Sequence, residues 1–299
     1  MQTQITPSYR TAPSAGQWAT VDPIEDCRLA LHKNAFRVVH PLAEHPLFSL
    51  DKLISVAQDA AKRPGDLYMD AGDLTLADTW GSVPPPQLPV AKVIEQIETA
   101  KAMIVLKHVE VDPAYKAVLD DYADFVWRVA GADGAKLLRS PEMLVFITSP
   151  HRKTPYHFDA EVNFLVQLYG SKDLWVCDPL DRSVTTEQEI ERYYAVSISA
   201  GIYKPLAEER ATHFTLDPGE AVHIPTHAAH WVRNRDNVSV SLSLNMEFPN
   251  WLQADVHRAN HYLRRLGLAP HPPGGSILID RSKAAAIDAL RSVKRLVRR

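Results

Sequence analysis

Residues 154–172 read Thr-Pro-Tyr-His-Phe-Asp-Ala-Glu-Val-Asn-Phe-Leu-Val-Gln-Leu-Tyr-Gly-Ser-Lys, and His157 and Asp159 stand two positions apart within them. On an extended strand, residues two apart point to the same face, so this imidazole and this carboxylate converge. A histidine and a carboxylate are two of the three ligands in the facial triad that holds non-haem Fe(II) and leaves positions open. The third ligand is therefore expected to be a histidine on a neighbouring strand.

The chain from residue 142 onward has the pattern of a β-rich domain. Strands are predicted over 143–148, 162–169, 172–177, 211–216, 220–224, 228–233 and 238–248, with a helical insertion over 186–194. Gly170-Ser171 predicts a tight type II′ hairpin between the second and third of these strands. Such a hairpin places alternate residues on one face, namely Asn163, Leu165, Gln167, Lys172, Leu174 and Val176. Short strands around His-x-Asp favour a double-sheet barrel of the cupin or jelly-roll kind.

Helices and further strands flank this barrel. Strands are predicted over 35–39, 67–69 and 102–109, and helices over 50–61 with Ser49 as cap, 90–99, 113–130 closed by Gly131, 249–266 and 282–299. The predicted fold class is mainly β with flanking helices. The predicted division is a flexible tail at 1–22, N-terminal elements packing on the barrel at 23–140, the catalytic barrel at 141–249 and C-terminal helices at 250–299.

Composition excludes several classes of protein. The chain has 299 residues, 45% of them hydrophobic, which is enough for one large or two small domains with a core. A formal charge of -3 gives no global field toward nucleic acid or membrane, and no apolar run is long enough to span a bilayer. Two distant cysteines, Cys27 and Cys177, and a polar N-terminus without a signal-peptide pattern predict a reduced, cytoplasmic protein.

A series of short motifs in this region matches a known family. The motifs are Thr154-Pro155-Tyr156-His157-Phe158-Asp159, Asn163 to Gln167, Gly170-Ser171-Lys172, Pro218-Gly219-Glu220, Ile224-Pro225 followed five residues later by His230, and Leu244-Asn245-Met246. In this combination the chain resembles the JmjC and cupin-like Fe(II)/2-oxoglutarate oxygenases, including the asparaginyl hydroxylase of hypoxia-inducible factor. The resemblance covers roughly residues 140–250.

The resemblance implies a site and an activity. It implies Fe(II) ligands at His157, Asp159 and His230, and 2-oxoglutarate contacts at Thr154, Asn163, Lys172 and Asn245, with no catalytic residue beyond the metal ligands. Its cofactors are Fe(II), 2-oxoglutarate and O2. The implied reaction hydroxylates a C–H bond of a protein, peptide or small molecule, or demethylates through hydroxylation, and releases succinate and CO2. It also implies a homodimer formed through the C-terminal helices.

Three other histidines compete with this assignment. His227 and His223 stand close to His230, and the spacing from Pro225 favours His230. His227 either lines the site or faces solvent, and His223, on a strand, is expected to pack or to be exposed. His151 precedes the motif and either touches substrate or is a solvated loop residue. Without the other motifs, His157 and Asp159 would be read as a surface pair.

Lys172 and the strand over 238–245 are the two features of the sequence that bear on 2-oxoglutarate binding. Lys172 shares a face with apolar residues, and a lone ammonium in a barrel interior is costly unless an anion pairs with it. The alternative is a lysine at a strand end that reaches solvent. The strand over 238–245 alternates valine or leucine with serine, so its serines either face water or line a pocket for a bound acid. Glu247 replaces the aromatic residue that the resembled hydroxylase has, which leaves substrate contacts on that side open.

Other functions remain alternatives at the level of sequence. A cupin metalloenzyme that does not use 2-oxoglutarate would retain the triad, but Lys172 and Thr154 argue against it. A non-catalytic cupin binding module would not need an intact triad. The C-terminal helix carries an apolar stripe, which would be buried on the barrel or on a second copy of the chain, while the basic flank of the helix could instead bind an acidic partner. The stripe consists of Ala284, Ala285, Ile287, Leu290, Val293 and Leu296.

Overall fold

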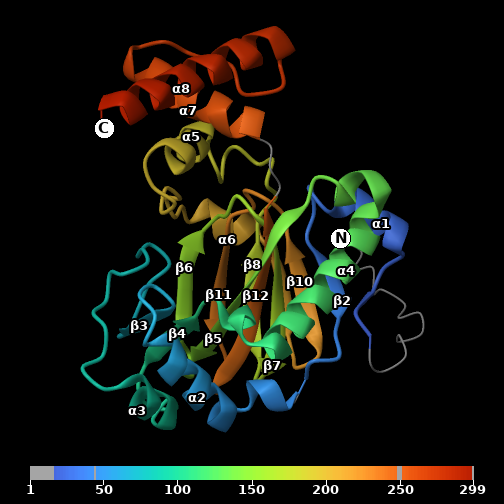
Figure 1. The fold of residues 1–299 in the computed structure, drawn as a ribbon, viewed down its shortest axis with the longest axis vertical. Coiled ribbons are helices and arrows are strands. Elements are labelled where there is room, and N and C mark those ends of the chain that lie inside the picture. Colours follow the sequence, from blue (N-terminus) through green and yellow to red (C-terminus); the bar gives the residue numbers. More distant parts are fainter. Residues whose placement is uncertain (1–16, 44, 248–250, 298–299) are drawn as a thin grey trace.

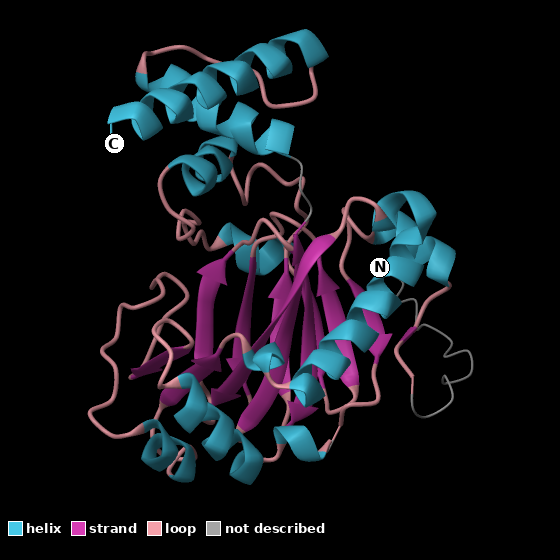
Figure 2. Cartoon of the chain, viewed as in Figure 1, coloured by secondary structure: helices cyan, strands magenta, loops and turns pink. Residues whose placement is uncertain are grey.

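The computed structural model describes residues 17–43, 45–247 and 251–297, and within them two antiparallel sheets face each other (Figures 1 and 2). The larger sheet has the strand order β1-β2-β10-β7-β12-β5-β4-β3. Its strands are β1 (Ala19–Thr20), β2 (Phe36–Val39), β3 (Leu67–Ala71), β4 (Ala102–Leu106), β5 (Arg139–Thr148), β7 (Val162–Tyr169), β10 (Glu220–Ile224) and β12 (Ser239–Glu247). The N-terminal segment thus extends the sheet with its own strands.

The smaller sheet closes the barrel. Its order is β6 (Lys153–His157), β11 (His230–Asn234), β8 (Lys172–Val176) and β9 (Thr212–Leu216). Apolar side chains from both sheets fill the space between them, namely Leu165, Leu174, Val176, Phe214, Leu216, Val222, Ile224, Ala228 and Val232. This packing confirms the predicted fold class, a double-sheet jelly-roll with flanking helices.

The predicted hairpin at Gly170-Ser171 is wrong. Strand β7 pairs with β10 and β12 in the larger sheet, whereas β8 pairs with β11 and β9 in the smaller one. The two residues carry the chain from one sheet to the other. The residues placed on one hairpin face, such as Leu165 and Leu174, still meet in the interior, because both sheets present alternate residues to it. The alternation of residues along a strand predicts which side chains point inward, but it does not predict which strands pair.

The outer face of the larger sheet is also covered. Helix α4 (Pro113–Ala135) crosses it (Figure 2), and Tyr122 on this helix donates a hydrogen bond to the carbonyl of Leu244 at 3.0 Å. The valines and leucines of β12 pack into this outer core, while Ser239, Ser241 and Ser243 are buried on the inner face. Of the two alternatives for the serines of this strand, the one in which they point into the barrel and not to water is therefore confirmed. Gly131, the expected helix end, has φ 73° and breaks the helix, which resumes to Ala135.

The remaining N-terminal and inserted helices are α1 (Ile24–Ala30), α2 (Leu50–Ala60), α3 (Val90–Glu95), α5 (Glu187–Ala195) and α6 (Leu206–Arg210). Of these, α2 and α5 lie close to their predicted positions, α3 ends four residues before its predicted end at 99, and α1 and α6 were not predicted. Ser49 caps α2 by accepting a hydrogen bond from the amide of Lys52. Of the tail predicted over 1–22, residues 1–16 lie outside the described residues. Trp18 is buried against Phe125, and β1 pairs with β2, so this part of the predicted tail belongs to the sheet.

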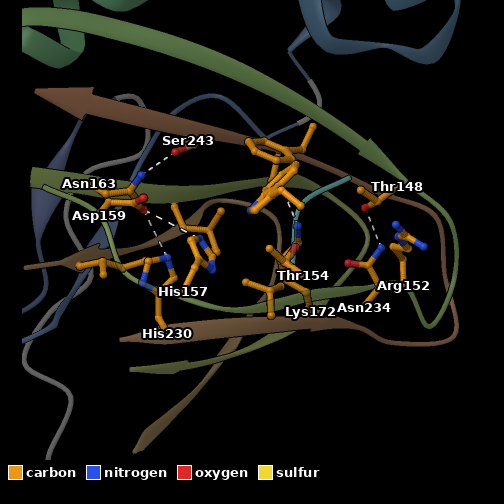
Figure 3. A pocket seen from close by; sticks show the side chains of 16 residues that line it. Thr148, Arg152, Thr154, His157, Asp159, Asn163, Lys172, His230, Asn234 and Ser243 are labelled. Atoms are coloured by element: carbon orange, nitrogen blue, oxygen red, sulfur yellow. Dashed lines mark hydrogen bonds and ion pairs between the residues drawn. The ribbon is translucent and has the colours of Figure 1, made fainter. Parts of the chain in front are cut away.

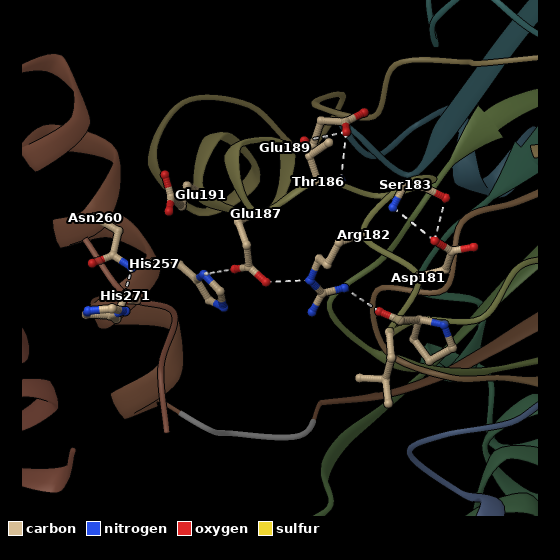
Figure 4. Close-up of polar contacts among 12 residues, drawn as sticks. Asp181, Arg182, Ser183, Thr186, Glu187, Glu189, Glu191, His257, Asn260 and His271 are labelled. Atoms are coloured by element: carbon tan, nitrogen blue, oxygen red, sulfur yellow. Dashed lines mark hydrogen bonds and ion pairs between the residues drawn. The ribbon is translucent and has the colours of Figure 1, made fainter. Parts of the chain in front are cut away.

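Two C-terminal helices, α7 (Trp251–Arg265) and α8 (Ile277–Val297), lie side by side, with α7 against α5 (Figure 1). The contact between α5 and α7 is polar. Arg264 of α7 forms an ion pair with the buried Glu191 of α5 at 2.7 Å. His257 of α7 lies 3.9 Å from Glu187 of α5 (Figure 4). In the described part of the chain, no helix is both long and apolar enough to cross a membrane.

The first prediction concerns Gly170, which connects the two sheets. Its φ is +68°, and an added Cβ would lie 2.1 Å from the carbonyl oxygen of Val238. Gly170→Ala should therefore lower the free energy of unfolding by more than about 2 kcal/mol, because both backbone strain and a steric clash oppose it. Chemical denaturation measures this change.

Gly65→Ala is the matched control. Gly65 has φ +89° but open space around its Cα, so this substitution reports the conformational cost alone. Equal losses of stability in the two variants would contradict the steric argument at Gly170.

Candidate metal centre

Three side chains from the smaller sheet converge at one end of the barrel. His157 ends β6, Asp159 lies two residues later in the loop after the strand, and His230 begins β11, where it pairs in register with His157. The Asp159 Oδ2 lies 3.8 Å from His157 Nε2 and 3.7 Å from His230 Nε2 (Figure 3). One ligand atom from each residue lies within 4.8 Å of the others, a spacing that could hold one metal ion. The predicted triad is thus brought together by adjacent strands.

Both imidazoles are oriented to present Nε2. The Nδ1 atoms lie 2.8 Å from the carbonyl of Pro155 for His157 and 2.9 Å from the carbonyl of Ala228 for His230. A carbonyl accepts only from a protonated nitrogen, so Nε2 carries the lone pair in the neutral ring. Burial, together with the nearby His157, lowers the pKa of His230 to about 4. His230 is therefore neutral near pH 7, as a metal ligand must be.

The backbone around Asp159 is fixed by the turn before β11. The amide of His227 donates a hydrogen bond to the carbonyl of Asp159 at 2.7 Å, and His227 has φ 63°. This bond ties the loop after β6 to the loop that leads into β11. The carboxylate and the distal histidine are held in mutual position by the main chain, before any ion binds.

Lys172 lies deeper in the same pocket and is 4% exposed. Its Nζ donates to Ser241 Oγ at 2.8 Å, and no carboxylate of the described residues lies within ion-pair distance of it. Burial lowers the pKa of Lys172 to about 7. A buried ammonium without a counter-charge is costly. The pocket is therefore electrostatically suited to an anion, and the alternative of a solvent-exposed lysine is wrong.

Two of the other predicted cosubstrate residues line the same pocket as Lys172, and the third lies next to it. Thr154 and Asn163 line the pocket, and the Asn163 amide donates to Ser243 Oγ and to Asn245 Oδ1. Asn245 lies in register opposite Asn163 and lines the adjoining outer cavity. The structure thus places Thr154, Asn163 and Lys172 in one pocket, with Asn245 next to Asn163 in the adjoining cavity. Their role in binding 2-oxoglutarate stays a prediction.

Several lining residues were not found from the sequence. Arg152 is 5% exposed, pairs with the buried Asp70 and lies with Asn234 at the far end of the pocket (Figure 3). Trp80 packs edge-on to His157, with ring centroids 6.4 Å apart. Trp80 and Asp70 come from the N-terminal segment, where no pattern in the sequence connects them to the motif.

The three competing histidines lie elsewhere. His223 is buried, with its ring nitrogens 2.7 Å from the carbonyl of Leu31 and 3.2 Å from the carbonyl of Asn163. His227 Nε2 contacts the hydroxyl of Tyr194 at 2.9 Å, so it neither ligates nor faces solvent freely. His151 is exposed and pairs with Asp236 at 3.2 Å. The spacing argument that favoured His230 therefore agrees with the geometry.

The fold and the triad together define a cupin-type protein with a candidate metal site. The sequence model of the cupin-like domain family matches residues 87–248, more than half of the chain. The chain belongs to this cupin-like domain family. The match begins before the predicted barrel at 141–249, because it includes the helices and strands that lead into β5.

Solved structures of YcfD, a ribosomal oxygenase from Escherichia coli, are similar to this chain. One is 13% identical, covers 91% of this chain and 67% of that chain, and has a TM-score of 0.49. Its complex with cobalt and 2-oxoglutarate is 14% identical, covers 88% and 63%, and has a TM-score of 0.45. In two other YcfD structures this chain spans only 59% and 58% of their length. No curated protein matches the chain.

The second prediction tests the triad as a metal site. Asp159→Ala and His230→Ala should each weaken binding of Mn(II) or anaerobic Fe(II) by more than about 100-fold, because loss of a ligand exceeds the loss seen for outer-sphere partners. Isothermal titration calorimetry measures the affinity, and circular dichroism verifies the fold.

His151→Ala is the control, because this exposed histidine is near the motif in sequence but pairs with Asp236. Its metal affinity should equal that of the natural chain. Unchanged binding in Asp159→Ala or His230→Ala would refute the site.

Proposed function

We propose that this chain is an Fe(II)- and 2-oxoglutarate-dependent oxygenase that hydroxylates a C–H bond of its substrate. One observation carries the proposal: a His-Asp-His triad and an unpaired buried ammonium share a single pocket. The triad leaves coordination positions open. The ammonium supplies the site for a carboxylate that reaches inward from the metal. A ligand with an anionic end and a metal-chelating end fits this pair.

The residues present fit the proposed groups. His157, Asp159 and His230 would hold Fe(II), with two imidazole nitrogens and one carboxylate, the donor set typical of this metal in oxygenases. Lys172 would bind the far carboxylate of 2-oxoglutarate, with the Thr154 hydroxyl beside it. When bound, the iron and 2-oxoglutarate supply the oxidative chemistry. The balanced reaction converts C–H, O2 and 2-oxoglutarate into C–OH, succinate and CO2.

The protein's own contribution is to bind, orient and exclude water. Ser241 and Ser243 are small, so they leave space between the sheets and still offer hydroxyls to a bound acid. The bond between Asn163 and Ser243 fixes the wall next to the triad. If the hydroxylated carbon is an N-methyl group, the resulting hemiaminal breaks its C–N bond and releases the amine and formaldehyde, so the net reaction is demethylation.

The third prediction tests Lys172. Lys172→Ala should raise the Kd for 2-oxoglutarate by about tenfold or more, since a charge-assisted hydrogen bond contributes about 1.5–3 kcal/mol. Mn(II) affinity should change little, because Lys172 does not belong to the triad. Titration of the Mn(II)-loaded protein with 2-oxoglutarate measures the effect.

Lys107→Ala is the control, since Lys107 lines the outer cavity and not the inner pocket. An unchanged Kd in Lys172→Ala would favour a cupin enzyme that does not use 2-oxoglutarate. Metal and 2-oxoglutarate binding with no turnover on any substrate would favour a binding module.

The fourth prediction concerns pH. Because burial lowers the pKa of Lys172 to about 7, the empty pocket holds the charged lysine only below that pH. Above it, binding of the carboxylate must take up a proton. The affinity for 2-oxoglutarate should therefore fall as pH rises from 7 to 9, by up to about tenfold per pH unit. Lys172→Met should give a flat profile over the same range, and a flat profile in the natural chain would contradict the argument.

We further infer that the chain forms a homodimer through its C-terminal helices. On α8, Ile287 is buried, whereas Leu290 and Val293 remain 52% and 56% exposed. An exposed apolar row on an amphipathic helix favours a partner surface of the same kind, as in a two-fold interface. Leu296, part of the predicted stripe, lies outside the described side chains. The cytoplasmic location stays a prediction of the sequence.

The fifth prediction tests this interface. Light scattering should give twice the 33.4 kDa chain mass for the natural protein at micromolar concentration. The double substitution Leu290→Lys/Val293→Lys should give a monomer. Leu180→Lys, which changes an exposed leucine away from α8, should leave the dimer intact. A monomeric natural chain would refute the proposal.

A further inference from the structure

A separate cavity, of about 460 Å³, lies on the outer face of the smaller sheet. Side chains of β6, β8 and β11 form its floor, and its walls are residues 75–77 and the segment around α6. This lateral cavity shares no lining residue with the inner pocket or with the outer cavity beside the triad. Its volume is within the range of about 300–1,000 Å³ that is usual for small-molecule sites.

Two positive side chains stand directly opposite each other in the lateral cavity. Lys153 of β6 and Arg233 of β11 are paired in register, and both line the cavity. Their neighbours on the same strands, Thr154 and Val232, line the inner pocket instead, so the two cations point to the outer face. Like charges directly opposite each other on antiparallel strands are destabilising. An anion bound between Lys153 and Arg233 would remove this repulsion.

The carboxylate nearest in register to this pair has other partners. Asp173 of β8 is the register partner of Arg233 on its other side. The Asp173 carboxylate instead accepts two hydrogen bonds from Arg235, at 2.9 and 3.1 Å, and lies 3.0 Å from a ring nitrogen of His213. Within residues 17–43, 45–247 and 251–297, neither Lys153 nor Arg233 forms an ion pair.

Two further carboxylates lie near the cations and do not pair with them. Glu208 lines the lateral cavity and accepts a hydrogen bond from the hydroxyl of Tyr203. Asp73 lines an adjoining cavity and forms an ion pair with Lys101 at 2.6 Å. The lining of the lateral cavity therefore has an excess of positive charge, with Lys153 and Arg233 against Glu208.

Stacked aromatic rings form the rest of the floor. Trp231 of β11 and Trp175 of β8 are in register, with ring centroids 5.8 Å apart and an interplanar angle of 8°. On the other side of Trp175, His213 of β9 stacks at 4.8 Å. Because both faces of Trp175 are covered, the cavity meets the edge of its ring. Ring edges carry the positive part of the aromatic quadrupole, so they attract negative charge and the negative faces of other rings.

We propose that the lateral cavity is a binding site for a small-molecule phosphate monoester that carries a planar ring. The phosphate lies between Lys153 and Arg233, where its three oxygens accept charge-assisted hydrogen bonds from both side chains. A phosphate monoester suits this pair better than a carboxylate because it carries up to two negative charges, one for each cation. The ring of the ligand lies against the edge of Trp175, in the T-shaped arrangement that aromatic pairs favour.

The test is isothermal titration calorimetry of the metal-free, full-length chain with phenyl phosphate, phenol and inorganic phosphate. Phenyl phosphate should bind at least about tenfold tighter than phenol, which lacks the anionic group. It should also bind tighter than inorganic phosphate, which lacks the ring. The inference is overturned if phenyl phosphate does not bind at millimolar concentration, or if either of the other probes matches its affinity.

Variants assign the binding to the two cations. Lys153→Met and Arg233→Met should each weaken binding of phenyl phosphate by about tenfold, the effect of losing one charge-assisted hydrogen bond. Lys101→Met is the matched control, because Lys101 is exposed, lines only the adjoining cavity and is paired with Asp73. Its affinity should equal that of the natural chain. Equal losses in all three variants, or full binding in the Lys153→Met/Arg233→Met double variant, would contradict the proposed site.

One further variant distinguishes the lateral cavity from the inner pocket, where the buried Lys172 also attracts anions. Lys172→Ala should leave the affinity for phenyl phosphate unchanged, because Lys172 does not line the lateral cavity. If this variant loses the binding, the phosphate occupies the inner pocket and the inference is wrong. The assay contains neither metal nor 2-oxoglutarate, so its outcome does not depend on the proposed oxygenase function.

Discussion

Strand β12 must bury both of its faces, and the rest of the structure depends on that constraint. One face packs on helix α4 through Val240, Leu242 and Leu244, and the other faces the smaller sheet through serines. If large apolar side chains stood at the serine positions, they would fill the interior in which Lys172 and the triad lie. Placing the core on the outer face leaves the inner face free for polar chemistry. The hydrophobic effect thus stabilises the face of β12 that packs on α4, while the opposite face lines the candidate metal centre.

The burial of Lys172 in this interior lowers the stability of the folded protein. Burial in the folded state lowers the pKa of this lysine from 10.5 to about 7. Between these pH values the unfolded chain holds a proton on Lys172 that the folded chain does not. Stability therefore decreases as pH falls from 10.5 toward 7, and the full penalty of a few kcal/mol is present below pH 7. An apolar residue of similar volume would pack there without that penalty. A bound carboxylate would offset this loss of stability, so a buried ammonium is better suited to a binding site than to a core.

The sequence predicted the parts of the site that depend on local spacing. His157 and Asp159 are two apart in the sequence, and the resemblance to the oxygenase family selected His230 by its distance from Pro225, so their convergence could be inferred before the fold was known, although the strand ends at His157 and Asp159 lies just beyond it. The strand pairing could not, because alternation gives the same inward residues whether β7 and β8 pair or lie in opposite sheets. Trp80 and Arg152 were missed for a similar reason. Their place in the site is set by long-range packing of the N-terminal segment, for which no periodicity exists.

Helix α5 connects the outer cavity to the C-terminal helices. Its Tyr193 lines the cavity, while Glu191 on the same helix is 1% exposed and pairs with Arg264 of α7. A buried ion pair of this kind costs more when broken than it contributes when made, because the remaining charge is left without a partner. Helix α7 therefore cannot leave α5 without a penalty at Glu191. Glu191 and Tyr193 lie on the same short helix, so the contact with α7 also helps to position Tyr193 in the outer cavity. The C-terminal segment therefore has a structural role at the site, whether or not it also joins two copies of the chain.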